Sequence, residues 1–416
     1  MKEAKRLFYL EGILQNYTWG GRSLIPNLVP TLKSGDKPLA EYWLGAHQTA
    51  PSIVKIEKEY PLDQLISSDK EGVLGKAVSK KFKRLPYLLK LLDVKDMLSI
   101  QVHPSKKEAE IEFAKENAAG IPLNAANRNY KDDNHKPELM VALNDFWLLH
   151  GFKQKEKLIQ TLSSVPELKY LISIFEKSGY EGLYKTVMEM PQVEVNKLLQ
   201  PLLDRIIPLY NAENLNKSQE DFWVARAATT FGKKQATRNE EQEIIDRGIF
   251  SIYFFNLLHL KKGEAIFQDA GVPHAYLEGH NVEIMANSDN VLRGGLTNKH
   301  IDVNELMKHI KFEAAKVEIQ TGRPAHDKEL VFETKAPDFQ LSVFQLKEKD
   351  HISITAVTAE ILLLTEGSIK LNEGSNQITL EKGHPAAIIF AGGKIQCTAL
   401  QNATLFRASV ALHISE

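Results

Sequence analysis

The sequence predicts a mainly β protein with a block of helices inserted into it, and the order of the patterns along the chain indicates this class. Residues 1–152 contain short β segments separated by Gly and Pro. Residues 153–244 have the apolar spacing of helices, and β character returns at residues 249–294. From about residue 323 the chain again forms short strands joined by glycine turns, which is typical of a small sandwich or barrel.

The strand predictions rest on apolar, β-branched and aromatic runs bounded by turn residues. The clearest runs are AEYWLGAH (40–47), PSIVKIE (51–57), PYLLKLLDV (86–94), ELMVALNDFWLLHGF (138–152), IFSIYFFNLLHL (249–260) and GEAIFQDAGVPHAYLEG (263–279). Residues 105–118 are predicted as a charged helix, residues 119–134 as a polar loop, and residues 301–322 as a helix followed by a linking segment.

The helical block is best defined by the stretch VEVNKLLQPLLDRII (193–207). Its apolar residues recur at the spacing of one helix face: Val195, Leu198, Leu199, Leu202 and Ile206. The stretches KEKLIQTL and DFWVARAATTF are of the same type. Because the block lies between two β-rich regions, we expect an insertion rather than a repeat.

Composition excludes several classes of partner. Hydrophobic residues make up 43% and charged residues 25% of the chain, and the net charge is −1, so no general attraction to nucleic acid or an acidic membrane follows. Cys397 is the only cysteine, which excludes an intrachain disulfide and fits a reducing compartment. The first residues, MKEAKRLFYLEGIL, are too charged for a signal peptide or membrane span, so we expect a cytoplasmic protein.

The stretch LSIQVHP (98–104) carries an unusual polar face. Successive side chains of a strand point to opposite sides, so Ser99, Gln101 and His103 share one face while the other face is apolar. A single His in a strand is more often a hydrogen-bonded core residue than a ligand. Two further polar stretches make a ligand the better interpretation of His103.

The first is DDNHKPELM (132–140), where His135, Lys136 and Glu138 crowd the start of an apolar strand. Taken alone, this run indicates a solvated loop that leads into an edge strand. A carboxylate that turned inward would need a cation or several donors to offset its desolvation.

The second is the stretch from Gly271 to Asp302, which keeps strand-like apolar residues among many polar ones. The polar residues are His274, Tyr276, Glu283, Asn287, Asp289, Arg293, Thr297 and Lys299. A surface loop would rarely keep this mixture, whereas the wall of a ligand-lined barrel would.

These stretches together predict a metal site. Its ligands would be two imidazoles, one carboxylate and one amide oxygen, from Gln101, His103, Glu138 and His274. Nitrogen and oxygen ligands without thiolate suit Zn²⁺, Fe²⁺, Mn²⁺ or Co²⁺, so the residues leave the metal open. A remaining coordination position would take water or a substrate oxygen.

A group of cations, Lys90, Lys136, Arg293 and Lys299, is expected beside the metal and would suit a phosphate. Each could instead be an ordinary surface cation, and for Lys299 the two interpretations are balanced. Arg293 is harder to explain in that way, because it precedes Gly294 and Gly295, which let backbone or ligand come close.

The chain resembles type I mannose-6-phosphate isomerase in five motifs that occur in order. They are QNYTWGG (15–21), EYWLGAH (41–47), LSIQVHP (98–104), HKPEL (135–139) and the stretch from PHAYL to EIMANSDNVLRGGLTNKHID (273–302). The resemblance implies a zinc-dependent aldose–ketose isomerase of the cupin type that interconverts mannose 6-phosphate and fructose 6-phosphate, with one zinc ion per chain and other divalent metals as alternatives. A monomer without nucleic-acid or membrane partners is expected.

The resemblance also implies roles for residues at matching positions. Gln101, His103, Glu138 and His274 would hold the zinc ion. Lys136 and Arg293 would take part in catalysis, and Lys90 and Ser99 would contact the phosphate. Matching active-site positions with less defined roles are His135, Tyr276, Glu283 and Asp289, of which Tyr276 is expected on the substrate. One departure is EGHN (278–281), a turn that differs in many members and concerns the substrate side.

The three-part organisation of that family predicts the domains. A cupin-type β-barrel or jelly roll would comprise residues 1–152 and 245–322, with the helical insertion at 153–244. Residues 323–416 would form a second cupin-like β domain without metal ligands.

For the reaction, the metal would orient the sugar oxygens as a Lewis acid, and Arg293 would stabilise an enediolate or hold the phosphate. The base stays open among a hydroxide at the metal, Glu283, Asp289 and His135. Two rival classes are a metal-dependent oxygenase, since two His and one carboxylate also suit Fe²⁺, and a non-catalytic sugar-phosphate or metal-binding protein.

Overall fold

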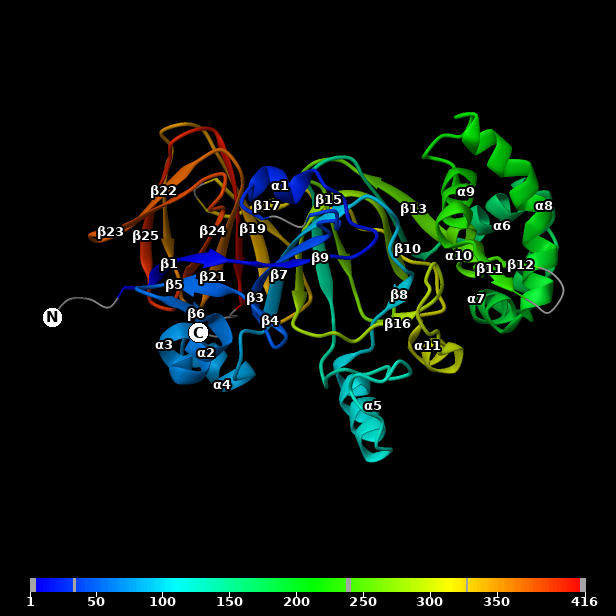
Figure 1. Cartoon of the computed structure of the whole chain (residues 1–416), viewed down its shortest axis with the longest axis horizontal. Coiled ribbons are helices and arrows are strands. Elements are labelled where there is room, and N and C mark those ends of the chain that lie inside the picture. Colours follow the sequence, from blue (N-terminus) through cyan, green and yellow to red (C-terminus); the bar gives the residue numbers. More distant parts are fainter. Residues whose placement is uncertain (1–4, 33–34, 237–240, 327, 412–416) are drawn as a thin grey trace.

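The computed structural model describes residues 5–32, 35–236, 241–326 and 328–411. Strands dominate. The helices of residues 155–254 lie at one end of the molecule's long axis, and the C-terminal strands lie at the opposite end, with the remaining strands between them (Figure 1). The predicted class, mainly β with a helical block, is confirmed. No helix in the described residues is long and apolar enough to cross a membrane.

The middle of the molecule is an eleven-stranded sheet. Its strands are β2 (Ile13–Gln15), β3 (Glu41–His47), β4 (Ala50–Pro51), β7 (Tyr87–Val94), β8 (Gln101–Val102), β9 (Glu138–Ala142), β10 (Phe146–Phe152), β13 (Phe255–Leu260), β14 (Ala265–Gln268), β15 (His274–Ala286) and β16 (Leu292–Arg293). The long strand β15 organises it, because β7, β8, β9 and β10 all pair with β15. Segments far apart in the sequence are thereby brought together.

A nine-stranded sheet lies beside it. Its strands are β1 (Leu7–Glu11), β5 (Ile53–Lys55), β6 (Glu59–Pro61), β17 (Arg323–Pro324), β18 (Glu329–Phe332), β19 (Gln340–Leu346), β21 (Glu360–Glu366), β24 (Ala386–Ile389) and β26 (Ala403–Ser409). Strand β1 pairs with β24 and β5, so the N-terminal region contributes to the C-terminal sheet. A four-stranded sheet of β20 (His351–Thr355), β22 (Ile369–Glu373), β23 (Asn376–Leu380) and β25 (Lys394–Ala399) completes this end, and β11 (Lys233–Ala236) pairs with β12 (Glu241–Ile244). In the described ranges no set of strands closes into a hydrogen-bonded ring.

The helices flank these sheets. They are α1 (Leu24–Leu28), α2 (Leu62–Ser68), α3 (Lys70–Leu74), α4 (Lys76–Phe82), α5 (Lys106–Ala118), α6 (Lys155–Ser164), the 3₁₀ turn Pro166–Leu168, α7 (Leu171–Glu189), α8 (Gln192–Asn211), α9 (Glu220–Phe231), α10 (Gly248–Phe254) and α11 (Val303–His309). The predicted charged helix is α5, which begins at Ser105 with reciprocal hydrogen bonds between Ser105 and Glu108. In α8, Val195, Leu199 and Leu202 are buried, as the helical spacing predicts.

Two local predictions differ from the structure. Residues 249–254 form the helix α10 rather than a strand, and every residue of α10 is buried. A continuous apolar run has no periodicity that separates a buried helix from a buried strand, and the Asp246 carboxylate accepts the backbone N–H of Gly248 where the helix begins. In LSIQVHP only Gln101–Val102 pairs regularly, because Leu98 and Ile100 donate their backbone N–H groups to Tyr276 and Gly295 instead.

Tyr87 joins the two large sheets. It lies on β7, is fully buried, and donates its hydroxyl to the carbonyl oxygens of Ala359 (3.1 Å) and Ala408 (3.0 Å) beside and in the nine-stranded sheet. The central and C-terminal sheets therefore share a polar contact inside a common apolar cluster.

We expect Tyr87→Phe to lower the free energy of unfolding by about 1–2 kcal/mol, because buried carbonyl groups lose a donor while the ring keeps its packing. Urea unfolding followed by fluorescence would measure it. The matched control is Tyr60→Phe, since Tyr60 is 39% exposed. Equal midpoints for the two variants would contradict a stabilising role of the Tyr87 hydroxyl.

Candidate active site

The expected metal ligands converge at the ends of three segments of the central sheet. Gln101 lies on β8 and His103 directly follows it, while Glu138 and His274 are the first residues of β9 and β15. Gln101 faces His274 across the β8–β15 pair. Because strand ends meet here, residues that are far apart in the sequence lie together.

The Glu138 carboxylate bridges the two imidazoles. Its Oε1 lies 3.4 Å from Nε2 of His103, and its Oε2 lies 3.2 Å from Nε2 of His274. All the ligand atoms of this trio lie within 4.8 Å of one another, and all three residues are buried. In the described parts of the chain no other group of three His, Cys, Asp or Glu residues has such an arrangement.

The chemistry of these atoms fits a divalent metal. Nδ1 of His103 lies 2.8 Å from the carbonyl oxygen of Asn290, and Nδ1 of His274 lies 2.9 Å from that of Val272. A ring that donates from Nδ1 keeps the lone pair of Nε2 for a metal. Nε2 of His103 is buried and has no hydrogen-bond partner among the described residues, which an ion would relieve.

The protonation of the trio also suits metal binding. Burial lowers the pKa of His103 to about 4, which keeps its ring neutral. Burial opposes ionisation of Glu138, but the charge of Lys136 and the hydrogen bonds of the two neighbouring imidazoles outweigh it and hold the pKa of the carboxyl well below its usual range. Neutral imidazole and ionised carboxylate are the forms that bind a metal.

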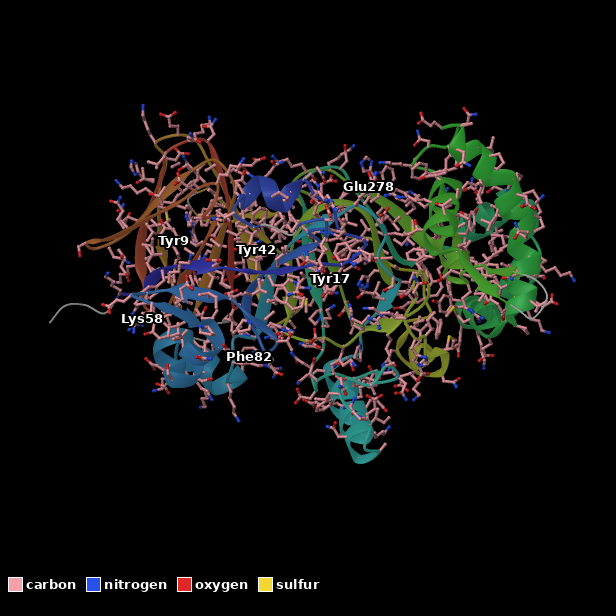
Figure 2. The ribbon with its side chains drawn as sticks, in the orientation of Figure 1. Tyr9, Tyr17, Tyr42, Lys58, Phe82 and Glu278 are labelled. Carbon is pink, nitrogen blue, oxygen red and sulfur yellow. The ribbon has the colours of Figure 1, made fainter. Side chains whose placement is uncertain are left out.

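A cavity of about 650 Å³ opens beside the trio. Its lining includes Ser99, Gln101, Lys136, Asp289 and Arg293. Tyr17, labelled in Figure 2, contributes to the same cavity from the N-terminal segment. The volume suits a small molecule such as a phosphorylated sugar.

The cations around this cavity fall into two kinds. Lys90 is held by carboxylates, with its Nζ 3.6 Å from Glu41 and 3.4 Å from Glu283, and Nζ of Lys136 lies 3.0 Å from Oε1 of Glu138. Burial lowers the pKa of Lys90, but the two carboxylates outweigh this effect and the pKa is raised. These lysines are neutralised by the protein itself.

Arg293 and Lys299 are different. Neither side chain has a carboxylate partner among the residues that the structure describes, although both line the cavity. Burial lowers the pKa of Arg293, and burial together with the Arg293 charge lowers that of Lys299. Cations without a counter-ion in a cavity are an anion site.

The loop that follows Arg293 is held in place by Asp246 and Gly248, which come directly after the helical block. Gly295, which has a φ of 126°, packs so tightly against Gly248 that a Cβ on it would collide with the Gly248 Cα. The Asp246 carboxylate accepts the backbone N–H groups of Leu296 (2.8 Å) and Thr297 (3.1 Å). Asp246 and Gly248 therefore fix the backbone between Arg293 and Lys299.

Glu283 lies behind Lys90, deep in the sheet. Its Oε2 accepts the hydroxyl hydrogen bond of Tyr276 at 2.8 Å. Burial, followed by the charge of Glu138, raises the pKa of Glu283 to about 7 although Lys90 opposes the shift. Tyr276 and Glu283 thus form one network with Lys90.

Asp289 presents its carboxylate to the cavity and is fixed from behind by His47, whose Nε2 lies 3.2 Å from Oδ2. His135 is not brought into this cavity: its Nε2 lies 2.8 Å from Asp338, and it lines a different pocket. The reason is strand-like alternation, because Lys136 takes the inward direction and its neighbour must take the other.

Glu41 and His47 belong to the site but were not singled out from the sequence. Both lie on β3 with Trp43 between them, on the same face by the period of a strand. The alternation in EYWLGAH that places polar residues on one face of an apolar strand is the signal that could have found them.

The fold and the site together define a metal-binding β protein with a cavity for an anionic small molecule. Comparison with known proteins makes this more specific. Residues 7–155 match the family model "Phosphomannose isomerase type I, catalytic domain". Mannose-6-phosphate isomerase of Escherichia coli strain K12 is 37% identical over 383 residues, covering 90% of this chain and 93% of the relative.

More distant relatives agree. Human mannose-6-phosphate isomerase is 31% identical and the match covers 97% of this chain and 99% of the relative. The solved structure of mannose 6-phosphate isomerase from Salmonella typhimurium, bound to substrate and to zinc, has a TM-score of 0.85 at 31% identity, covering 98% of this chain and 100% of that one. The chain belongs to the mannose-6-phosphate isomerase family.

We expect His103→Ala to lose bound zinc while the fold is kept, because the remaining trio lacks a ligand whose Nε2 has no other partner. Elemental analysis after gel filtration measures the metal, and circular dichroism measures the fold. His351→Ala, on an exposed strand of the C-terminal end, is the matched control. Zinc retained at the wild-type ratio in His103→Ala would exclude this residue as a ligand.

Proposed function

We propose that this protein is a zinc-dependent isomerase that interconverts D-mannose 6-phosphate and D-fructose 6-phosphate. The observation that carries the proposal is the position of two unpaired cations, Arg293 and Lys299, in the cavity that adjoins the His103–Glu138–His274 trio. The family relationship supports it, since the neighbouring Salmonella structure holds substrate and zinc. A sugar phosphate that binds with its phosphate at the cations and its sugar oxygens at the metal would have a single orientation in the cavity.

The zinc ion would be held by His103, Glu138 and His274, with Gln101 as the fourth ligand because it faces His274 and lines the cavity. When bound, zinc supplies Lewis-acid polarisation of the sugar oxygens at C1 and C2. Gln101 and Lys136, whose Nζ lies 3.0 Å from Glu138, line the cavity, so a sugar bound there would lie next to the zinc ligands.

The phosphate would bind to Arg293 and Lys299, with Ser99 on the same cavity. A guanidinium fork and an ammonium group without carboxylate partners offer their donors to phosphate oxygens. Lys90 could contact the phosphate only by leaving Glu41 and Glu283. Its ion pairs support another role, which is to hold Glu283 and Tyr276 in place.

The reaction moves a proton between C2 and C1 through an enediol-type intermediate. Asp289 would move this proton, because its carboxylate lies on the cavity wall and His47 fixes its orientation. The charged Arg293 guanidinium and the Lys136 ammonium group would stabilise negative oxygen as it develops. Glu283 and Tyr276 would not touch the sugar. They would hold Lys90, which lines the cavity, in its position.

At the level of the fold, we propose a cupin-type catalytic domain in residues 1–152 and 245–322, a helical insertion at 153–244 and a second cupin-like domain at 323–416. The pairing of β1 with β24 supports a close union of the first and last of these. The single buried Cys397 supports a cytoplasmic setting, and a monomer remains our prediction.

The proposal is tested by the production of fructose 6-phosphate from mannose 6-phosphate in a coupled assay. We expect turnover by the zinc-loaded protein, its loss after chelation, and its return with added Zn²⁺. Absence of turnover in zinc-loaded protein would contradict the proposal, and oxygen uptake with Fe²⁺ in the same protein would favour an oxygenase.

The role of Asp289 is tested in that assay by Asp289→Asn. We expect turnover to fall by about 10²–10⁴-fold at unchanged zinc content, because the amide keeps the shape but cannot accept the proton. The matched control is Asp96→Asn, which also lines the cavity and is paired with Arg226. A loss of turnover equal in both variants would remove Asp289 as the base.

The placement of the phosphate is tested by comparing Arg293→Gln with Lys90→Met. We expect Arg293→Gln to abolish competition by inorganic phosphate, because the unpaired guanidinium is the anion's main donor. Lys90→Met should lower turnover, because Glu283 loses its cation, while its residual turnover is still inhibited by phosphate. The opposite pattern, phosphate inhibition lost only in Lys90→Met, would place the phosphate at Lys90.

A further inference from the structure

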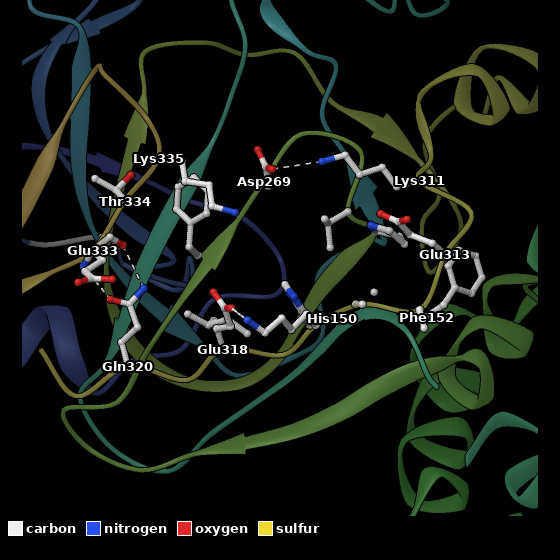
Figure 3. Close-up of a pocket in the computed structure, with 18 residues that line it drawn as sticks. His150, Phe152, Asp269, Lys311, Glu313, Glu318, Gln320, Glu333, Thr334 and Lys335 are labelled. Carbon is white, nitrogen blue, oxygen red and sulfur yellow. Dashed lines mark hydrogen bonds and ion pairs between the residues drawn. The ribbon is translucent and has the colours of Figure 1, made fainter. Parts of the chain in front are cut away.

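A second cavity, of about 480 Å³, shares no lining residue with the first. Strands β10 and β14 form its floor, and residues 311–320 and 333–335 form its rim (Figure 3). Figure 3 shows carboxylates and lysines around its opening, with Asp269 paired to Lys311 and His150 at its floor. The proposed reaction uses none of these residues.

The floor of this cavity adjoins the metal ligands through the strand register. His150 on β10 is directly opposite His274 on β15, and His274 is in turn opposite Gln101 on its other side. Residues directly opposite each other in antiparallel strands point to the same face. His274 therefore stands between Gln101, which lines the first cavity, and His150, which lines the second.

His150 has the features of a metal ligand, and the proposed reaction does not use it. It is 5% exposed, and its Nδ1 lies 2.7 Å from Oε1 of Gln268, to which it donates. Gln268 is the strand neighbour of Glu138. Nε2 of His150 makes no hydrogen bond within the described ranges, so a buried imidazole turns a free lone pair toward the cavity that it lines.

The two cavities differ in the sign of their charge. Lysine and arginine outnumber carboxylates around the first cavity, where Arg293 and Lys299 are unpaired. The second cavity is lined by four carboxylates, from Asp269, Glu313, Glu318 and Glu333, and by three lysines, two of which pair with Asp269 and Glu318. The balance of charge at the second opening is therefore the more favourable one for a divalent cation.

We infer that the second cavity is the route by which the divalent metal reaches and leaves the buried trio, with His150 as a transient ligand on the way. The inference rests on the proposed metal site at His103, Glu138 and His274, none of which is more than 3% exposed. An ion passes from the acidic rim to Nε2 of His150 and then to His274, its neighbour across the strand pair. The cations at the substrate opening stay available for the phosphate, because the metal does not pass through that opening.

The experiment measures zinc transfer itself, not activity. Metal-free full-length protein is mixed with Zn²⁺ held by a fluorescent chelator, and the rate of transfer, the reverse rate and the final zinc content are recorded. We expect His150→Phe to slow uptake and release together, on the order of tenfold, because the route loses its one imidazole ligand. The equilibrium affinity should stay unchanged, since the final ligands are intact.

A rim variant tests the electrostatic step without touching the core. Glu313→Lys with Glu318→Lys alters exposed residues and should slow uptake on the order of tenfold at low salt, with the effect lost at high salt. The matched control is His259→Phe, a histidine of the same sheet whose ring stacks on Trp147 and which lines neither cavity. It should transfer zinc at the wild-type rate.

The outcomes separate the two proposals. Wild-type protein that takes up no zinc would refute the metal site itself. Normal zinc content with equal transfer rates in wild type, His150→Phe and the rim variant would refute only the route. Arg293→Gln gives a further arm: faster uptake in this variant would assign metal loading to the substrate opening and overturn the inference.

Discussion

The structure of the site depends on the Glu138 carboxylate, which is buried between two imidazoles. A carboxylate in such a place is costly unless cations or donors surround it. Lys136 contributes one charge, while His103 and His274 are turned by backbone carbonyls so that their free nitrogens face the same carboxylate. The partnerless nitrogen of His103 is then left for a divalent ion, which needs the ligands of three distant segments to meet.

The cations around this centre are of two kinds: some are paired with carboxylates, and others have no carboxylate partner among the described residues. Lys90 is fixed between Glu41 and Glu283, and it stabilises the network that ends at Tyr276. The loop that follows Arg293 is held by Asp246, which comes just after the helical block. Asp246 thus has a structural role in the site, because it orders the backbone between Arg293 and Lys299.

Residue patterns selected side chains that the structure brings together where the polar face of a strand stood out against an apolar one. Glu138 and His274 were selected because each lies in a stretch where strand-like apolar residues are mixed with an unusual number of polar ones. His135 was also selected, yet it turns to Asp338, since adjacent residues of an extended chain cannot both face one cavity. The alternation of residues along a strand assigns each side chain to one of two faces, but it does not show which face lines the cavity.

The sequence by itself determined the class of the fold, the helical block and the ligand types, because periodicity and residue chemistry are local properties. It left α10 ambiguous, since a run that is buried on all sides has no polar face to reveal its period. Only the tertiary structure decided which lysines are neutralised, that β1 joins the C-terminal strands, and that a second cavity ends beside His274. Those features are contacts between residues far apart in the chain, and pairing across such distances is fixed by the packing of whole sheets.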